Sequence, residues 1–245
     1  VDDAKRIFEE QLQRLQTDYI DFYLLHAVNK EKWDAMKELG VVEYCAKLKE
    51  EGKIRYYGFS FHDDYEVFDE ILHYRDWDFC QIQYNYMDTQ EQAGDKGYAL
   101  AESLGVPLVI MEPIKGGSLA NFSEDINDRF HKMDPDRSVA SYALRWVGSH
   151  PNVKVILSGM STMEQVEDNL KTFQDFSPLS EAEEKEIESI VTELRSRVQN
   201  GCTGCRYCMP CPAGVNIPGN FKVWNNYHMY RTYAVSYTHL RAHET

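Results

Sequence analysis

The chain has 245 residues, with 26 Lys and Arg against 40 Asp and Glu, and a formal net charge of −14. This length allows one large domain with a small appendage, and the acidic balance argues against a nucleic-acid backbone as partner. The charge is uneven, because residues 198–245 hold four basic residues and one acidic residue, which leaves residues 1–197 at −17. We therefore expect a boundary near Asn200-Gly201.

The chain begins in a helical pattern and continues as apolar strands that alternate with amphipathic helices. Ile7, Leu12 and Leu15 share one helical face directly after Val1, so we expect a natural beginning upstream. Apolar runs predict five strands, at Ile20–Leu25, Ile54–Ser60, Phe79–Asn85, Pro107–Glu112 and Val153–Ser158. Helical patterns follow at residues 31–51, 65–73, 96–104, 138–148, 162–173 and 180–198.

Repeated strand–helix units of this length predict an α/β fold with a parallel sheet covered by helices. Capping boxes mark the last two helix starts, where Thr162 precedes Gln165 and Ser180 precedes Glu183. Five units are too many for one half of a dinucleotide-binding sheet and suit a (β/α)8 TIM barrel. Five strands cannot close such a barrel, so we expect them to be about strands 4–8, with the other three upstream.

Polar residues follow the predicted strands, at the edge of the barrel where active sites form. They are His26, Ser60-Phe61-His62, Gln83-Tyr84-Asn85, Glu112–Gly117 and Ser158–Ser161. The glycines after the last two strands permit backbone N–H groups to approach a phosphate, although they could equally serve only to turn the chain. A histidine at a strand end is either a satisfied core residue or an acid–base or hydrogen-bonding group, and both readings stay open for His26.

Four cysteines lie within ten residues, at Cys202, Cys205, Cys208 and Cys211, and Pro212 follows them. A tight run followed by proline favours a 4Fe–4S cluster, whereas structural zinc usually takes two separated pairs, and disulfides or bare thiols remain further alternatives. The last gap has two residues instead of the usual three, which makes Cys211 a candidate ligand of a second centre. We predict a small C-terminal iron–sulfur module, which could be electron-transferring or could mainly fold the extension.

The other two cysteines, Cys45 and Cys80, have the sequence surroundings of small apolar core residues. Clustered free thiols favour a reducing compartment, and we expect a cytoplasmic location.

Several motifs in register closely resemble the aldo-keto reductase family. They are Leu15–His26, Gly52–Ser60, Gln81–Asn85, Met111–Gly117 and Gly159–Asn169. The resemblance covers about residues 1–177 and implies a (β/α)8 barrel that reduces carbonyls with a nicotinamide cofactor, usually NADPH. The cysteine run is similar to a subgroup of that family with a C-terminal 4Fe–4S ferredoxin-type extension.

The resemblance implies a tyrosine proton donor tuned by lysine, aspartate and histidine. Only the histidine maps onto this sequence, at His26, where it would hydrogen-bond the substrate carbonyl. The other three would lie upstream of Val1, so the resemblance implies that this chain alone is inactive in carbonyl reduction.

The resemblance also implies three groups of cofactor-binding residues. Ser60 and Gln81 would bind the nicotinamide amide, and Met111 lies where an aromatic residue often stacks. The pyrophosphate loop would be formed by Pro113, Ile114 and Gly116. The adenosine end would be held by Gly159, Met160, Ser161, Gln165, Asp168 and Asn169. Phe61 replaces the usual asparagine after Ser60. Lys and Arg, which often grip the 2′-phosphate of NADPH, are replaced by Gly159 and Gln165, so the cofactor is expected to be NADP or NAD.

The expected organisation is a partial barrel at 1–177, a connecting helix at 178–200, a truncated ferredoxin-like segment at 201–234, and a non-native tail at 235–245 that resembles a translated sequencing adapter. The expected function is an NAD(P)H-dependent oxidoreductase acting on a small-molecule carbonyl substrate, with a redox partner protein as a further possibility. The alternatives are a non-catalytic redox-sensing or electron-transfer protein with a nucleotide-binding barrel, and a reductase with a structural zinc knob.

Overall fold

The computed structural model describes residues 1–230, which form two compact units. Unit 1 contains residues 1–113 and 150–158, and unit 2 contains residues 114–149 and the chain from 159 onward. Each unit is described separately below. The predicted tail at 235–245 lies outside the described residues. Within residues 1–230, no helix combines the length and the apolarity that crossing a membrane requires.

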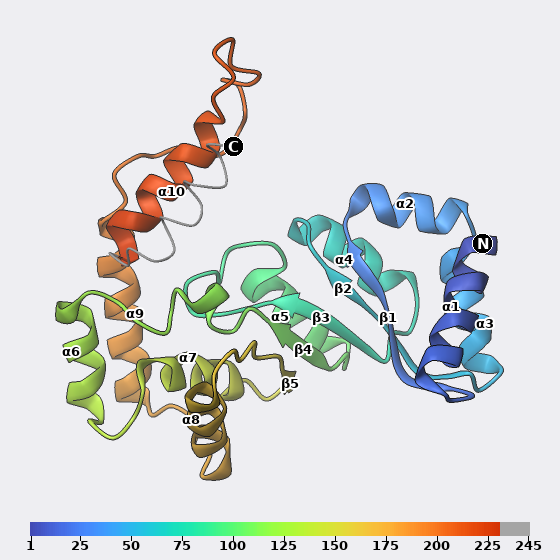
Figure 1. The fold of residues 1–245 in the computed structure, drawn as a ribbon, viewed down its shortest axis with the longest axis horizontal. Helices are drawn as coiled ribbons and strands as arrows, with labels where there is room; N and C mark the ends of the chain where they lie inside the picture. The colour runs from blue at the N-terminus through green and yellow to red at the C-terminus, as the bar shows by residue number, and fades with distance from the viewer. Residues whose placement is uncertain (231–245) are drawn as a thin grey trace. The chain divides into compact units, whose positions relative to one another are not determined.

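Unit 1 is built on a parallel sheet of five strands in chain order (Figure 1). The strands are β1 Ile20–Val28, β2 Ile54–Phe61, β3 Phe79–Gln83, β4 Leu108–Met111 and β5 Val153–Ile156. All four strand pairs are parallel. This confirms the five predicted strands and the α/β class, with β1 longer and β3, β4 and β5 shorter than their apolar runs.

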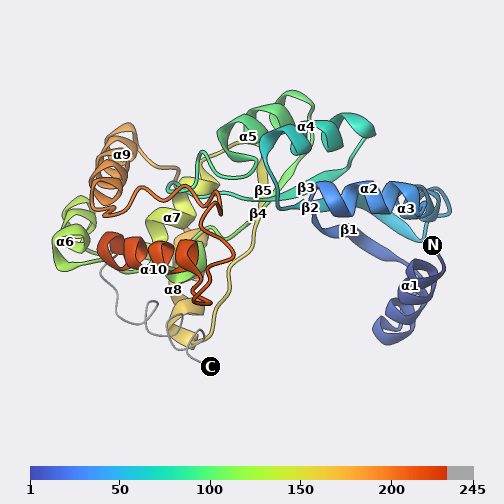
Figure 2. The same cartoon turned by 90° about the horizontal axis from the view of Figure 1, so that it is seen from above.

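One face of this sheet is covered by helices, and Figure 2 shows α3, α4 and α5 on that side. The helices of unit 1 are α1 Asp2–Leu15, α2 Lys30–Glu38, α3 Val41–Glu50, α4 Tyr65–Tyr74 and α5 Gly94–Ser103. Tyr57 packs against Trp77 at 5.1 Å between ring centroids and donates a hydrogen bond to Val42 O of α3. Phe59 packs against Phe68 of α4 at 5.9 Å, so the core lies between sheet and helices.

The opposite face of the sheet carries exposed apolar side chains. Side chains alternate along a strand, so Tyr56 faces away from its buried neighbour Tyr57. Phe22 of β1 stacks on Tyr56 at 4.8 Å and meets Phe79 edge-on at 5.6 Å, yet it is 64% exposed. Val155 of β5 is also exposed. These residues form an apolar face that no element of the described chain buries.

Two helix predictions for unit 1 were wrong in detail. The single helix expected at 31–51 is two helices, because Gly40 adopts the left-handed conformation (φ +68°) between α2 and α3. A glycine takes this conformation without the Cβ penalty and so ends α2. In α1 the buried face is Phe8 and Leu12, whereas Leu15 is exposed, because Phe8 packs edge-on against Tyr23 of β1.

Unit 2 is helical. It contains the short 3₁₀ turn η1 Lys115–Gly117 and the helices α6 Glu124–Met133, α7 Val139–Gly148, α8 Met163–Gln174, α9 Glu181–Ser196 and α10 Ile217–Tyr230. The predicted capping boxes at Thr162 and Ser180 are confirmed at the starts of α8 and α9. Helices α6 and α10 were missed, although Ile126 and Phe130 stand four residues apart on one buried face of α6.

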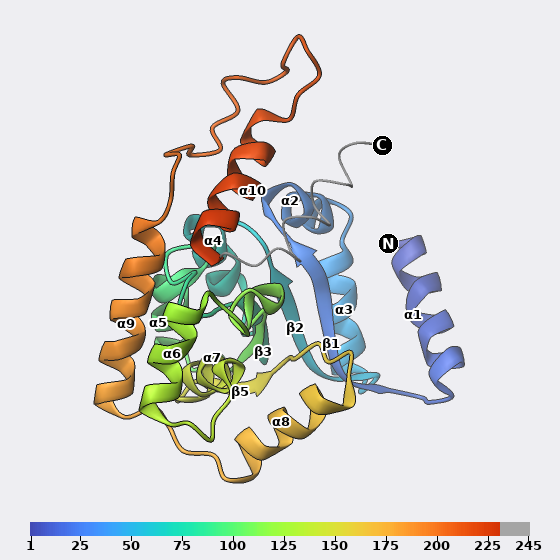
Figure 3. The ribbon, with the colours of Figure 1, turned by 60° about the vertical axis from the view of Figure 1, so that its left-hand side comes forward.

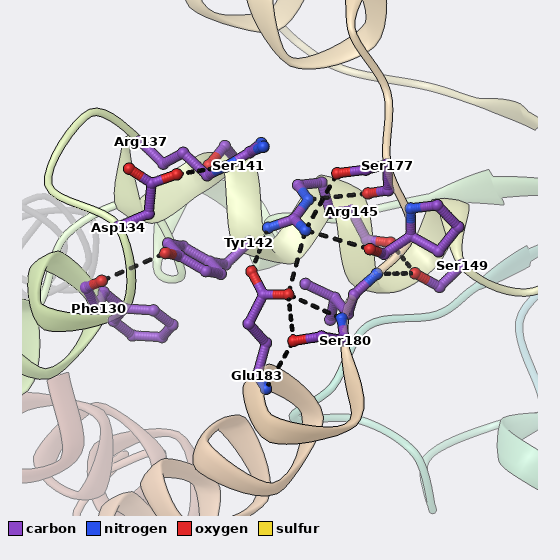
Figure 4. A network of polar contacts seen from close by, with 12 residues as sticks. Phe130, Asp134, Arg137, Ser141, Tyr142, Arg145, Ser149, Ser177, Ser180 and Glu183 are labelled. Atoms are coloured by element: carbon purple, nitrogen blue, oxygen red, sulfur yellow. Dashed lines mark hydrogen bonds and ion pairs between the residues drawn. The ribbon is translucent and has the colours of Figure 1, made fainter.

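Polar contacts tie the helices of unit 2 together. Arg129 of α6 binds Glu186 at 2.7 Å and Glu193 at 2.9 Å, both on α9, and Figure 3 shows these two helices side by side. Arg145 of α7 is almost fully buried and donates to the backbone oxygens of Ser177 and Pro178 and to the carboxylate of Glu183 (Figure 4). This guanidinium therefore holds the start of α9 against α7.

Candidate functional site

Three of the predicted nicotinamide-side residues lie on neighbouring strands of unit 1. Ser60 near the end of β2 is directly opposite Gln81 of β3 in the parallel register. The Gln81 amide Nε2 donates to the sulfur of Met111, at the end of β4, at 3.4 Å. The resemblance groups these three residues at the nicotinamide, and the structure places an amide and a soft thioether beside each other on adjacent strands.

His26 lies in an irregular part of β1. Leu25 pairs with Phe59 and Val28 pairs with Phe61, so β1 has one more residue than β2 over this stretch, and the ladder shifts between the two pairs. The extra residue forms a β-bulge at His26-Ala27, in which Ala27 adopts a positive φ of 52°. The His26 side chain is exposed. The bulge therefore sets the direction in which the imidazole leaves the strand.

The Ser60 hydroxyl contributes to this bulge. Its Oγ accepts a hydrogen bond from the backbone N–H of Ala27 at 2.7 Å, across 33 residues of sequence. Ser60 is only 1% exposed. The sequence predicted a contact to the cofactor for Ser60, and it contained no signal for this second contact within the protein.

Asn85 is a further polar residue at this edge, and no specific role was predicted for it. It is fully buried, and its Oδ1 accepts from the backbone N–H groups of Met87 and Asp88, both at 3.0 Å. Its Nδ2 donates to the Asp88 carboxylate at 3.0 Å and to Glu112 O at 3.1 Å. Asn85 thus joins the segment after β3 to the segment after β4.

His62 follows β2 at the same edge of unit 1. Its backbone N–H donates to Val28 O at 2.8 Å, just beyond the bulge. Burial lowers the pKa of the His62 imidazole, while the negative charge of Glu112 acts in the opposite direction and His26 adds to the lowering. His62 thus lies within electrostatic reach of His26, although only His26 was predicted as a catalytic residue.

The predicted pyrophosphate loop has an unusual backbone. Pro113 is buried at the end of the unit 1 segment. Within unit 2, Lys115, Gly116 and Gly117 have positive φ values of 48°, 60° and 91° in succession, after Ile114. Only glycine adopts such angles readily, which explains the Gly-Gly pair. The Gly117 N–H donates to Ile114 O at 3.0 Å and the Ser118 N–H donates to Lys115 O at 3.1 Å, so the turn is closed by its own backbone hydrogen bonds.

The predicted adenosine-side residues gather at the start of α8 in unit 2. Gln165 is engaged in the capping box, where its Oε1 accepts from Ser161 N at 2.7 Å and Thr162 N at 3.3 Å. The Asp168 carboxylate accepts from the Ser138 hydroxyl at 2.6 Å. Gly159 and Met160 precede the helix and are exposed, and Asn169 lies one residue beyond Asp168. The capping box thus engages the N–H groups of Ser161, Thr162 and Gln165, and the Glu164 carboxylate lies in the same turn.

The cysteine run is held differently from the prediction. Cys202, Cys205 and Cys208 are exposed and Cys211 is partly exposed. Within residues 1–230, no three His, Cys, Asp or Glu side chains are grouped closely enough to hold a metal ion. The four thiols, as placed, therefore do not form the predicted metal site. A backbone N–H from Tyr207 and the Thr203 hydroxyl lower the pKa of Cys205.

The two remaining cysteines behave as the sequence predicted. Cys45 and Cys80 are buried, and burial raises the pKa of the Cys45 thiol to about 11 and that of Cys80 further. Thiols that resist ionisation are poor nucleophiles and metal ligands, so their role is packing.

The Aldo/keto reductase family model matches residues 2–192. The chain therefore belongs to this family. It is 27% identical over 206 residues to the uncharacterized oxidoreductase YqkF of Bacillus subtilis, covering 76% of this chain and 64% of that protein. The chain thus spans less than two thirds of the length of this relative.

Solved structures agree with the family assignment. The aldo-keto reductase AKR11C1 from Bacillus halodurans, in its apo form, is 28% identical with a TM-score of 0.63, over 76% of this chain and 67% of that chain. An aldo/keto reductase from Klebsiella pneumoniae in complex with NADP and acetate is 26% identical with a TM-score of 0.59, over 76% and 64%. The parallel five-stranded sheet is consistent with the (β/α)8 barrel of this family.

Proposed function

We propose that residues 1–177 form part of the barrel of an NAD(P)H-dependent aldo-keto reductase that interconverts small-molecule carbonyls and alcohols. The observation that carries this proposal is the alignment of Ser60, Gln81 and Met111 on three adjacent strands at the edge where His26 is exposed. Family membership adds independent support, because strand ends are where barrel enzymes place their chemistry.

The residues present suit the nicotinamide end of such a cofactor. When bound, a reduced nicotinamide supplies hydride. The Gln81 amide can both donate and accept, which matches a carboxamide, and Met111 offers a polarizable apolar surface beside it. His26 would donate a hydrogen bond to the substrate carbonyl oxygen and stabilise the negative charge that develops there. No tyrosine of this chain is assigned the proton-donating role.

The phosphate end of the cofactor has two supports within unit 2. Gly116 and Gly117 have no side chain to obstruct a pyrophosphate, and the exposed Gly159 and Met160 precede α8 where an adenosine phosphate would lie. Asp168 and Asn169 would hold the adenine. Because Gly159 and Gln165 carry no charge, we propose that the chain accepts NADP or NAD with little preference, although the related Klebsiella protein was solved with NADP.

For the cysteine segment we propose a 4Fe–4S cluster bound by Cys202, Cys205, Cys208 and Cys211. The support is the spacing of four thiols within ten residues, three of them exposed to solvent. The segment would have to close around the cluster, since the thiols do not converge as placed. No step of the carbonyl chemistry is assigned to it, because hydride transfer moves two electrons and a cubane cluster usually moves one.

The test is to titrate the 245-residue chain with nucleotide and to monitor binding by intrinsic tryptophan fluorescence. NADPH and NADH should both bind, and Gln81→Ala should weaken both by about tenfold, or about 1.4 kcal/mol. The matched control is Gln174→Ala, an exposed glutamine at the end of α8, which should leave affinity unchanged.

One outcome would contradict the proposal, and a second would revise only the assignment of the proton donor. Absence of binding by either nucleotide would favour the alternative of a protein with no nicotinamide chemistry, a possibility supported only by the unusual Phe61, Met111, Gly159 and Gln165. NAD(P)H-dependent carbonyl turnover by this chain alone would show that a residue within it supplies the proton.

A further inference from the structure

We propose that Ser60 is a positioning residue for His26, acting through the β-bulge at Ala27. The inference rests on the proposed function for its relevance to catalysis, but the structural relationship can be tested without any nucleotide. The resemblance assigns Ser60 a contact to the nicotinamide amide, and the contact proposed here is a different one, made within the protein.

The backbone of Ala27 needs an external partner. Alanine with φ +52° is in the left-handed region, where its Cβ crowds the following carbonyl, so the conformation persists only if the surroundings hold it. At a bulge the extra residue is left out of the strand ladder, and its N–H must find another acceptor. The Ser60 Oγ at 2.7 Å is that acceptor.

The bulge controls His26 because the two residues are adjacent. Without the extra residue, the strand would keep its alternation and every side chain beyond Leu25 would move to the opposite face of the sheet. The Leu25–Phe59 and Val28–Phe61 pairs fix the strand on either side, so the change of direction is confined to His26-Ala27. A single hydrogen bond to Ala27 therefore influences where the imidazole points.

Ser60 is suited to this role by its burial and its size. At 1% exposure, its hydroxyl is shielded from water that would compete for the Ala27 N–H. The serine side chain is also short, so its Oγ lies at 2.7 Å from the Ala27 nitrogen and serves as a fixed acceptor within the protein.

The experiment measures amide hydrogen exchange at Ala27 and the imidazole resonances of His26 by NMR in the 245-residue chain. Ser60→Ala should accelerate exchange of the Ala27 amide by about fivefold or more and shift the His26 resonances, whereas Ser60→Thr, which keeps a hydroxyl, should restore both to near wild-type values. The matched control is Ser103→Ala at the exposed end of α5, which should change neither.

A double-mutant cycle separates positioning from general stability. In the Ala27→Gly background the left-handed backbone no longer depends on an external hold, so Ser60→Ala should shift the His26 resonances less than it does beside alanine. If Ser60→Ala does not fold, Ser60→Cys carries the same test, because a thiol is nearly isosteric and a weak acceptor.

Unchanged Ala27 exchange and unchanged His26 resonances in a folded Ser60→Ala or Ser60→Cys variant would overturn the inference. Because the readout needs no cofactor, the inference can succeed even if nucleotide titration shows no binding. It can equally fail while NADPH binds normally, so the two proposals are tested separately.

Discussion

The side-chain amide of Asn85 joins the ends of two neighbouring strands, since its Nδ2 donates to the backbone oxygen of Glu112 at 3.1 Å. Glu112 has a positive φ of 53° and immediately precedes Pro113. A positive φ is unfavourable for a residue other than glycine, and a following proline restricts the backbone further. The buried amide thus stabilises a strained turn that leads into the proposed phosphate loop. The turn at Glu112 therefore depends on Asn85, which lies 27 positions earlier in the chain.

Replacing Asn85 should destabilise unit 1. Asn85→Asp keeps the oxygen that accepts from Met87 and Asp88 but loses the donor and places a second carboxylate beside Asp88. We expect the free energy of unfolding to fall by about 2–3 kcal/mol, because a buried group loses its partner. Urea denaturation followed by circular dichroism measures this. Asn121→Asp, at an exposed position, should change stability by under about 0.5 kcal/mol, and equal losses for both would contradict the assignment.

The contact between Arg145 and Glu183 should make stability depend on pH. Burial by itself would raise the pKa of Glu183, but the hydrogen bonds from Arg145 and Ser180 outweigh it and hold the pKa at about 2 (Figure 4). A carboxyl group whose pKa is lower in the folded chain stabilises it above the unfolded pKa of about 4.5 and loses that contribution as pH falls toward 2.

The measurement is urea unfolding of the wild type and Glu183→Gln at pH 7 and pH 3. At pH 7 the free energy of unfolding of the wild type should exceed that of Glu183→Gln by about 2–3 kcal/mol, and this difference should be smaller at pH 3. Glu181→Gln is the matched control, since Glu181 lies exposed in the same helical turn and binds only Lys185 in the same helix. A difference that stays constant between the two pH values would show that the stabilisation is not ionic.

Gly159 offers a position at which cofactor preference can be changed. A Cβ added there would meet no atom within 4 Å, and its φ lies outside the left-handed region, so a side chain fits without strain. Gly159→Lys should strengthen NADPH binding by about tenfold and leave NADH binding nearly unchanged, because only NADPH carries the 2′-phosphate. Fluorescence titration with both nucleotides is the measurement. Gly201→Lys, equally unobstructed, is the control, and equal gains for NADPH and NADH would refute a 2′-phosphate contact.

The apolar face formed by Phe22, Tyr56 and Val155 should cause this chain to self-associate. Exposed aromatic side chains favour association with another apolar surface. Strand β1 is also an edge strand of the described sheet, with β2 as its neighbour, and edge strands favour pairing with another chain. Phe22→Lys should raise the monomer fraction in size-exclusion chromatography with light scattering. Leu15→Lys removes an equally exposed apolar residue from α1, away from that face, and should have little effect. A monomeric wild type at about 100 μM would contradict this prediction.

The cysteine segment should retain iron when the chain is made without oxygen. Iron and inorganic sulfide analysis should give about four of each per chain, and Cys205→Ser should lower both strongly. Cys45→Ala is the control, because its buried thiol resists ionisation and should not affect metal content. Zinc in place of iron would support a structural zinc site, and neither metal would leave four ordinary thiols.

Much of the fold follows from local sequence. Alternation and apolar runs located all five strands, and the capping boxes at Thr162 and Ser180 located the starts of α8 and α9. These signals act over a few residues, so they can be recognised from the sequence without knowledge of the fold. The break at Gly40 was missed because the apolar spacing continues across it. A single glycine inside a helical pattern also does not by itself predict a left-handed turn.

The site divides in the same way. The sequence by itself located the strands that carry His26, Ser60 and Gln81, because apolar runs are a local pattern, but it ended the first strand at Leu25, before His26. Only the tertiary structure decided that Ser60 holds Ala27 and that Asn85 holds Glu112. These hydrogen bonds join backbone groups to side chains about thirty residues away, and a directional bond of this kind exists only after the parallel register has brought the two strands together.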